Sequence, residues 1–137
     1  MACEAIAYAR AGLIGNPSDG YFGKTISFTM RDFGAKVSFY EHPEVEIVPS
    51  MRDRSTYASV RDLVEDVQHF GYYGAIRLVK AAIRKFVDYC DQEKIALPDR
   101  NFQVRYRTTI PRHVGLAGSS ALVTATMKCL IEFYEVE

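Results

Sequence analysis

The strongest alternation of apolar and polar side chains covers residues 102–110. Every second residue from Phe102 to Ile110 is apolar, aromatic or β-branched, and the residues between them are Gln, Arg or Thr. This period of two predicts a strand with one buried face. A glycine- and serine-rich segment at 111–121 follows, and helical spacing continues from there to residue 137. The order predicts a strand, a glycine-rich turn and a helix.

The first fifty residues contain several shorter β-prone segments. Weak alternation predicts a strand at 4–9. Residues 24–30 and 35–41 are rich in β-branched and aromatic side chains and are predicted to form a hairpin that turns at 31–34. Residues 45–48 are a candidate third strand. This part of the chain is therefore predicted to supply most of a sheet.

The middle of the chain has helical periodicity. A first helix is predicted to begin at Ser55 or Thr56 and to end near Gly71. A second helix is predicted for 73–93, with an apolar stripe on one side. In the last helix, small residues form a track that permits close packing on a sheet: Ala121, Ala125 and Cys129. Strands first, then two helices, a strand and a helix predict an α+β domain.

The glycine-rich turn is the main candidate for chemistry. Gly115 and Gly118 let the backbone approach a ligand closely, and Ser119 and Ser120 supply adjacent hydroxyl groups. Unpaired N–H groups and the positive end of a helix dipole stabilise an anion, most simply a phosphate. Either hydroxyl could also ligate a hard cation such as Mg²⁺. The same residues are also compatible with a serine-capped helix that binds nothing.

Composition limits the classes of protein. The chain has 137 residues, of which 48% are hydrophobic, so we expect one domain with a proper core, or part of a larger protein. Lys+Arg and Asp+Glu balance at 17 each, which argues against a protein that mainly binds a nucleic-acid backbone. The sequence shows no signal peptide and no membrane-spanning apolar run. Three widely spaced cysteines are interpreted as free thiols in the cytosol.

Other catalytic patterns fit less well. Gly23-Lys24-Thr25 resembles the end of a P-loop, but Ser18 stands where that motif needs its first glycine. The serines do not match a GxSxG nucleophile elbow, and the three histidines have no zinc-ligand spacing. Alternating arginines could bind RNA, although on an exposed strand they are more typical of a solvated surface. These arginines are Arg105, Arg107 and Arg112.

Two separated segments resemble the GHMP small-molecule kinases. Residues 10–23, RAGLIGNPSDGYFG, resemble the first motif of that family, with its arginine, its Leu-Ile-Gly and its turn with an aspartate. Residues 111–121, PRHVGLAGSSA, resemble the second motif, the phosphate loop, but contain one extra residue between Leu116 and the serines. That departure, the Gly-Asn-Pro-Ser-Asp turn and the FGYYG sequence at 70–74 are similar to one branch, the glucuronokinases.

The resemblance implies a fold and a nucleotide site. The fold would be a two-layer α+β domain, residues 1–137, with a left-handed βαβ unit. The ATP phosphates would lie in the second motif, and one serine of the pair Ser119 and Ser120 would help to hold Mg²⁺. The residues implied to bind the nucleotide phosphates are Pro111, Gly115, Leu116, Ala117, Gly118, Ser119, Ser120 and Ala121.

The resemblance also implies roles at the first motif. Arg10 would steady charge on the transferring phosphoryl group, and the turn residues Asn16, Ser18 and Asp19 would face a sugar. A uronate carboxylate would need a cationic partner. Lys24, Arg31 and Arg112 are candidates, and the sequence does not decide among them.

The implied activity is an ATP-dependent sugar 1-kinase that converts D-glucuronate to glucuronate 1-phosphate in the cytoplasm. Alternatives are a GHMP kinase for another sugar or small alcohol, and a non-catalytic or RNA-binding module on the same fold. The family's catalytic aspartate and third glycine-rich motif would come after residue 137. We therefore expect this chain to be an N-terminal portion with little activity alone, which needs a C-terminal domain in cis or in trans.

Overall fold

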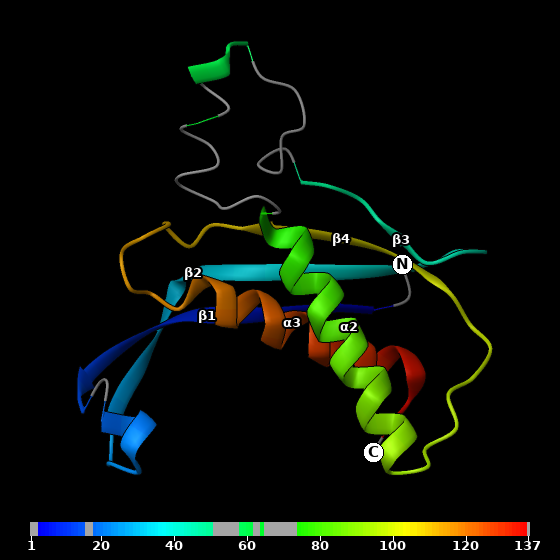
Figure 1. Cartoon of the computed structure of the whole chain (residues 1–137), viewed down its shortest axis with the longest axis horizontal. Helices are drawn as coiled ribbons and strands as arrows, with labels where there is room; N and C mark the ends of the chain where they lie inside the picture. Colours follow the sequence, from blue (N-terminus) through cyan, green and yellow to red (C-terminus); the bar gives the residue numbers. More distant parts are fainter. Residues whose placement is uncertain (1–2, 16–17, 51–57, 62–63, 65–73, 137) are drawn as a thin grey trace.

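The computed structural model describes residues 3–15, 18–50, 58–61, 64 and 74–136. Four strands form a single sheet in the order β1-β2-β4-β3, and two long helices accompany it (Figure 1). The elements are β1 (Cys3–Ile14), a short 3-10 helix η1 (Ser18–Tyr21), β2 (Ile26–Glu41), β3 (Glu46–Ile47), α2 (Gly74–Gln92), β4 (Phe102–Thr108) and α3 (Gly118–Tyr134).

The domain has two layers, with both helices on one face of the sheet (Figure 1). β2 pairs antiparallel with β1 and with β4, whereas β3 runs parallel to β4. The parallel pair is connected through α2. If Figure 1 is turned so that β3 and β4 point upward, with the helices still toward the viewer, β4 lies to the left of β3. This is the left-handed βαβ crossover that the sequence resemblance implied, and it is rare because parallel crossovers are almost always right-handed.

The predicted hairpin at 24–41 is wrong. The segment forms one strand, β2, because both of its halves pair with β1: Ile26 to Met30 with Ile14 to Ala9, and Gly34 to Phe39 with Tyr8 to Cys3. The residues at 31–33 make a bulge between Met30 and Gly34 and do not reverse the chain. Phe33 packs against the core from this bulge, which favours a continuous strand over a turn.

The other predicted elements are present in the described residues, with changed ends. The strand predicted at 4–9 extends to Ile14, and the one at 102–110 ends at Thr108. The candidate strand at 45–48 is the two-residue β3, and the helix predicted at 73–93 is α2. Of the helix predicted from Ser55 or Thr56, residues 60, 61 and 64 are helical, and most of the remainder lies outside the described residues.

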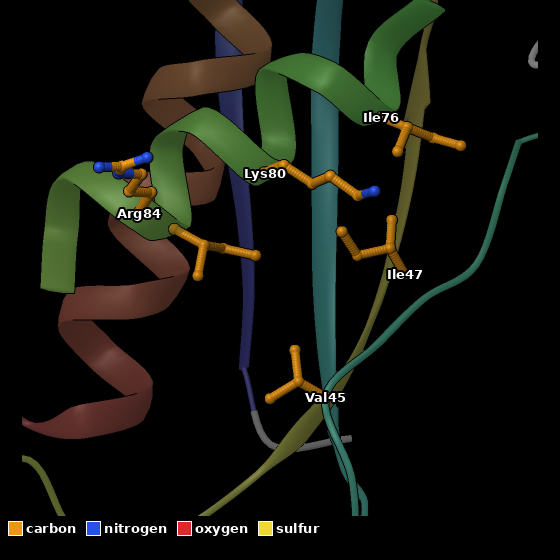
Figure 2. A pocket seen from close by; sticks show the side chains of 6 residues that line it. Val45, Ile47, Ile76, Lys80 and Arg84 are labelled. Carbon is orange, nitrogen blue, oxygen red and sulfur yellow. The ribbon is translucent and has the colours of Figure 1, made fainter. Parts of the chain in front are cut away.

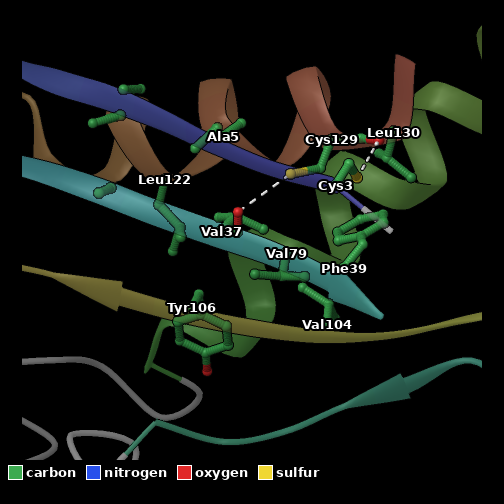
Figure 3. Packing of buried hydrophobic residues seen from close by; sticks show 14 of the residues in the cluster. Cys3, Ala5, Val37, Phe39, Val79, Val104, Tyr106, Leu122, Cys129 and Leu130 are labelled. Carbon is green, nitrogen blue, oxygen red and sulfur yellow. Dashed lines mark hydrogen bonds between the residues drawn. The ribbon is translucent and has the colours of Figure 1, made fainter. Parts of the chain in front are cut away.

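The core lies between the sheet and α3 (Figure 3). Alternate residues of β1 and β2 are buried there, and the small side chains of β1, such as Ala5 and Ala7, leave room for the helix. The small-residue track of α3 is buried as predicted: Ala121, Ala125 and Cys129. Large rings fill the far end, where Phe39 and Phe102 stack with centroids 4.0 Å apart. α2 covers α3 and adds Val79 and Phe86 to the same core.

Arg100 joins the end of α3 to the sheet. Its Nη1 donates to the carbonyl oxygen of Phe133 at 3.2 Å, and its Nη2 donates to Glu41 Oε1 at 3.0 Å. The guanidinium carbon also lies 4.5 Å from the centre of the Phe133 ring. In return, the Tyr134 hydroxyl donates to the Arg100 carbonyl oxygen at 3.0 Å. The bond to Phe133 satisfies one of the last carbonyl groups of α3, which have no N–H partner inside the helix.

Candidate functional site

The helix α3 begins without a side-chain cap. Its N-cap is Ala117, in the left-handed conformation with φ 56°, and the cap makes no side-chain hydrogen bond. The N–H of Ala121 donates to the Ala117 carbonyl at 2.9 Å, so the N–H groups of Gly118, Ser119 and Ser120 precede the first bond of the helix. The alternative of a serine-capped helix is therefore wrong: both serines lie inside the first turn and leave these donors available.

The loop before α3 has an alternating backbone. φ is positive at His113 (58°), Gly115 (74°) and Ala117 (56°) and is not positive at the two residues between them. Such alternation turns successive N–H groups toward one side and forms a concavity that binds anions. A Cβ added at Gly115 would meet nothing within 4 Å, so only the backbone conformation requires glycine there. The loop and the start of α3 together form one cluster of N–H donors.

The side chains at this helix start fit a phosphate with a metal ion. Ser119 and Ser120 are exposed, and neither hydroxyl has a partner among the described residues. The first turn of α3 has no acidic residue to offset the helix dipole. Mg²⁺ is usually held by a few protein oxygens together with substrate phosphates, which a serine hydroxyl here can supply. The described residues contain no cluster of three His, Cys, Asp or Glu that would hold a metal by themselves.

Arg10 is bonded to this loop through its backbone. Its N–H donates to the carbonyl oxygen of Leu116 at 3.1 Å, so the two motifs lie side by side although they are a hundred residues apart. The Arg10 side chain is exposed and has no ion-pair partner in the described part of the chain. Its cross-strand partner is Thr29, on the face of β1 opposite to buried Ala9.

The turn predicted to contact a sugar is held by hydrogen bonds within the turn itself. The Ser18 hydroxyl donates to the Gly15 carbonyl, and the Gly23 N–H donates to the Ser18 carbonyl at 2.8 Å. Gly15 has φ +93°, and a Cβ there would lie 2.3 Å from the Lys24 carbonyl oxygen, so this position requires glycine. Asn16 lies outside the described residues, as does the side chain of Asp19, whose backbone belongs to η1. The roles of Asn16, Ser18 and Asp19 stay predictions.

Two of the three arginines considered for RNA lie on the sheet, whereas Arg112 lies in the loop that follows β4. Arg105 and Arg107 are exposed on the sheet face away from the helices, and Arg105 Nε donates to Gln103 Oε1 at 2.9 Å. On the same face, Lys36 lies 2.5 Å from the Glu4 carboxylate, and this bond lowers the pKa of Glu4. Such pairing is typical of a solvated face.

The structure contains a pocket that the sequence did not predict. It has a volume of about 560 Å³ and lies between β3 and α2, and its lining consists of four apolar and two cationic residues (Figure 2). Its lining residues are Val45, Ile47, Ile76, Lys80, Ile83 and Arg84. None of them belongs to a motif, so only the tertiary structure brings them together. The pocket includes none of the predicted site residues.

The thiols are not suited to nucleophilic chemistry. Cys3, Cys90 and Cys129 are free and buried, as expected for unpaired thiols. The Cys129 Sγ donates to the Val37 carbonyl at 3.3 Å and the Cys3 Sγ to the Cys129 carbonyl at 3.5 Å. Burial raises the pKa of Cys129 to about 12. A thiol that stays protonated is a poor nucleophile.

Comparison with known proteins finds one matching family model and similar sequences. Residues 77–137, from α2 to the end of the chain, match the model of the GHMP kinases N terminal domain. The chain is 44% identical over 134 residues to probable glucuronokinase 2 of Arabidopsis thaliana and 43% identical over 136 residues to glucuronokinase 1 of the same plant. Part of the chain therefore matches the N-terminal domain of the GHMP kinases, and nearly all of it is similar to two glucuronokinases.

The GHMP fold also matches solved structures. The chain aligns over its full length with 42% of the Methanococcus jannaschii mevalonate kinase, with a TM-score of 0.68 at 20% identity. A second mevalonate kinase structure gives a TM-score of 0.59 at 17% identity, over 98% of this chain and 41% of that one. These likenesses establish the fold. None of the helices in the described ranges has the length and apolarity to cross a bilayer.

The relatives are considerably longer than this chain. The alignments with the two Arabidopsis glucuronokinases cover 97% and 98% of the chain but only 37% and 38% of those proteins. The chain therefore spans less than two fifths of the length of these curated relatives.

Proposed function

We propose that this domain supplies the nucleotide-phosphate half of an ATP-dependent sugar 1-kinase that acts on D-glucuronate. The whole protein would transfer the γ-phosphoryl group of ATP to the anomeric hydroxyl, which gives glucuronate 1-phosphate and ADP. The glucuronokinase relatives support this substrate. The observation that carries the proposal is the cluster of N–H donors at the start of α3, bonded to the strand that bears Arg10.

The chemistry follows from the charges of phosphoryl transfer. The transition state is loose, so rate enhancement comes mainly from positioning and from neutralising charge on the phosphoryl oxygens. In the proposal, the loop from Pro111 to Ala121 holds the β- and γ-phosphates by backbone N–H groups. The exposed guanidinium of Arg10 stabilises the transferring group. The hydroxyl of Ser119 or Ser120 would hold Mg²⁺, which would supply positive charge against the phosphates.

The sugar would lie beside the first motif. In the proposal, the turn containing Asn16, Ser18 and Asp19 contacts its hydroxyl groups. The hydroxyl of Ser18 already donates to Gly15, so its remaining capacity is as an acceptor. A general base and the rest of the acceptor site would come from the part of the relatives that this chain does not span.

The direct test is nucleotide binding by the chain itself. A non-hydrolysable ATP analogue with Mg²⁺ should raise its melting temperature in proportion to the logarithm of ligand concentration. Changing Ser119 and Ser120 together to Ala should weaken this shift but leave the unliganded melting temperature nearly unchanged, because neither serine caps the helix. No shift with Mg²⁺ and nucleotide, or salt-sensitive RNA binding in its place, would overturn the proposal.

A further inference from the structure

The strand pair β1–β2 continues past the N-terminal end of α3. We define this extension as the arm: residues 11–14 of β1 and 26–29 of β2, which lead to the η1 turn (Figure 1). In Figure 1 the arm runs from the sheet toward η1, on the side where α3 begins. An isolated pair of strands is only marginally stable in water. The surface chemistry of the arm therefore indicates what it is built to contact.

The register gives the arm one apolar and one polar face. Cross-strand partners share a face, and Ala9 pairs with Met30 on the side of the core. Two residues further, Ala11 pairs with Phe28, and a register shift after Gly12 then brings Ile14 opposite Ile26. The opposite face carries the pair Gly12–Ser27 and Thr29, whose partner Arg10 comes directly before the arm. The core stripe of the sheet thus continues along the arm.

No described helix covers this stripe. The exposed fractions are 50% for Phe28, 58% for Ile26 and 64% for Ile14, whereas Ala9 in the same stripe is completely buried. Aromatic residues follow at the tip, where Tyr21 and Phe22 are also exposed. Contiguous apolar surface of this kind on a protein marks an interaction site. We call Ile14, Ile26 and Phe28 the arm face.

We propose that the arm face is the docking surface for a second domain, the one that corresponds to the remaining length of the glucuronokinase relatives. The relatives have enough further sequence for such a domain, because the chain covers only 37–38% of their length. Phe28 of the arm face comes directly before Thr29, which is the cross-strand partner of Arg10. The N–H of Arg10 is in turn bonded to Leu116 in the phosphate loop. A domain on the arm face therefore adjoins that loop and closes one side of the transfer site.

This placement deepens the proposed function. It rests on that function only in treating the neighbouring loop as a phosphate site. The docking itself depends on apolar burial. Its partner can be supplied in the same polypeptide or as a separate chain. The polar face of the same strand, with Ser27 and Thr29, stays in water and provides a matched control.

The test compares the chain alone with a chimaera in which residues 1–137 replace the matched region of Arabidopsis glucuronokinase 1. Hydroxyl-radical labelling of Phe28 should fall several-fold in the chimaera. The double change I26E/F28E should lower the melting temperature of the chimaera by about 5 °C or more and that of the chain alone by less than about 1 °C. The control S27E/T29E should change neither protein by more than about 1 °C.

Three results would overturn the inference. These are equal labelling of Phe28 in both proteins, equal effects of the two double changes on the chimaera, and a dimer of the isolated chain that I26E/F28E dissociates. The last result would assign the arm face to a second copy. Nucleotide protection of the same samples separates the two proposals, because arm-face variants leave Ser119 and Ser120 intact. If nucleotide raises the melting temperature but the arm face does not dock, only this inference fails. If the arm face docks but nucleotide has no effect, only the kinase assignment fails.

Discussion

The backbone N–H of Arg10 donates to the carbonyl oxygen of Leu116 at 3.1 Å. This bond ties the backbone of Arg10 in β1 to the loop that leads into the start of α3. Because both partners are main-chain atoms, the contact survives substitution of either side chain. The position of Arg10 relative to the loop is therefore a property of the fold, and its charge can be changed separately.

Replacing Arg10 with Met in a full-length protein that carries this domain should reduce kcat by about 10²- to 10³-fold, with a smaller change in KM. The reason is that the guanidinium would neutralise charge that grows in the transition state. Stability should stay within about 0.5 kcal/mol, since the side chain is exposed. Steady-state kinetics and urea unfolding provide the measurements. A change confined to KM would remove the catalytic role.

Changing Gly115 to Ala should weaken nucleotide binding and lower stability by about 1 kcal/mol, because φ there is +74°. Gly20 is a matched control: a Cβ there also meets nothing within 4 Å, and its φ is not positive. The G20A variant should therefore bind nucleotide as the parent does. Thermal unfolding with and without Mg²⁺ and an ATP analogue distinguishes the two. Equal behaviour of both variants would contradict the alternating backbone of the loop.

Replacing Arg100 with Ala should destabilise the domain by about 1–3 kcal/mol, since it removes a charged donor from the Phe133 carbonyl and a cation–π contact. The R100K variant keeps the charge but loses the planar guanidinium with its several N–H donors. Most of the loss of stability should therefore remain. The control E41Q should cost less than about 0.5 kcal/mol, because Glu41 is exposed. Urea unfolding measures all three. A large loss of stability in E41Q would show that the ion pair between Arg100 and Glu41 provides most of the stabilisation.

The stability of the domain should fall as pH rises from about 9 to about 12. Burial raises the pKa of Cys129 from 9.0 to about 12, so the folded state holds this proton more tightly than the unfolded state. The contribution is complete below pH 9 and is lost as pH rises through the folded value. Urea unfolding of the parent and C129A across this window checks it. A slope that C129A leaves unchanged would show that other groups dominate.

The sequence by itself determined the elements with a strong period, and it predicted the chemistry of the two motifs. The strand that becomes β4, the helix α2 and the small-residue track of α3 all follow from local spacing, because the period of the side chains decides which face is buried. Glycines and serines in their order indicated a helix start that binds an anion. These features need only neighbours along the chain.

Tertiary structure alone decided the rest. The segment at 31–34 resembles a turn, yet it is a bulge, since β1 is long enough to pair with both halves of β2. Ser119 resembles a cap, yet Ala117 occupies that position in a left-handed conformation. The bond between Arg10 and Leu116 and the continuous apolar stripe of the arm depend on register between distant strands. Pairing and burial are settled by partners far away in the sequence, which local propensity does not contain.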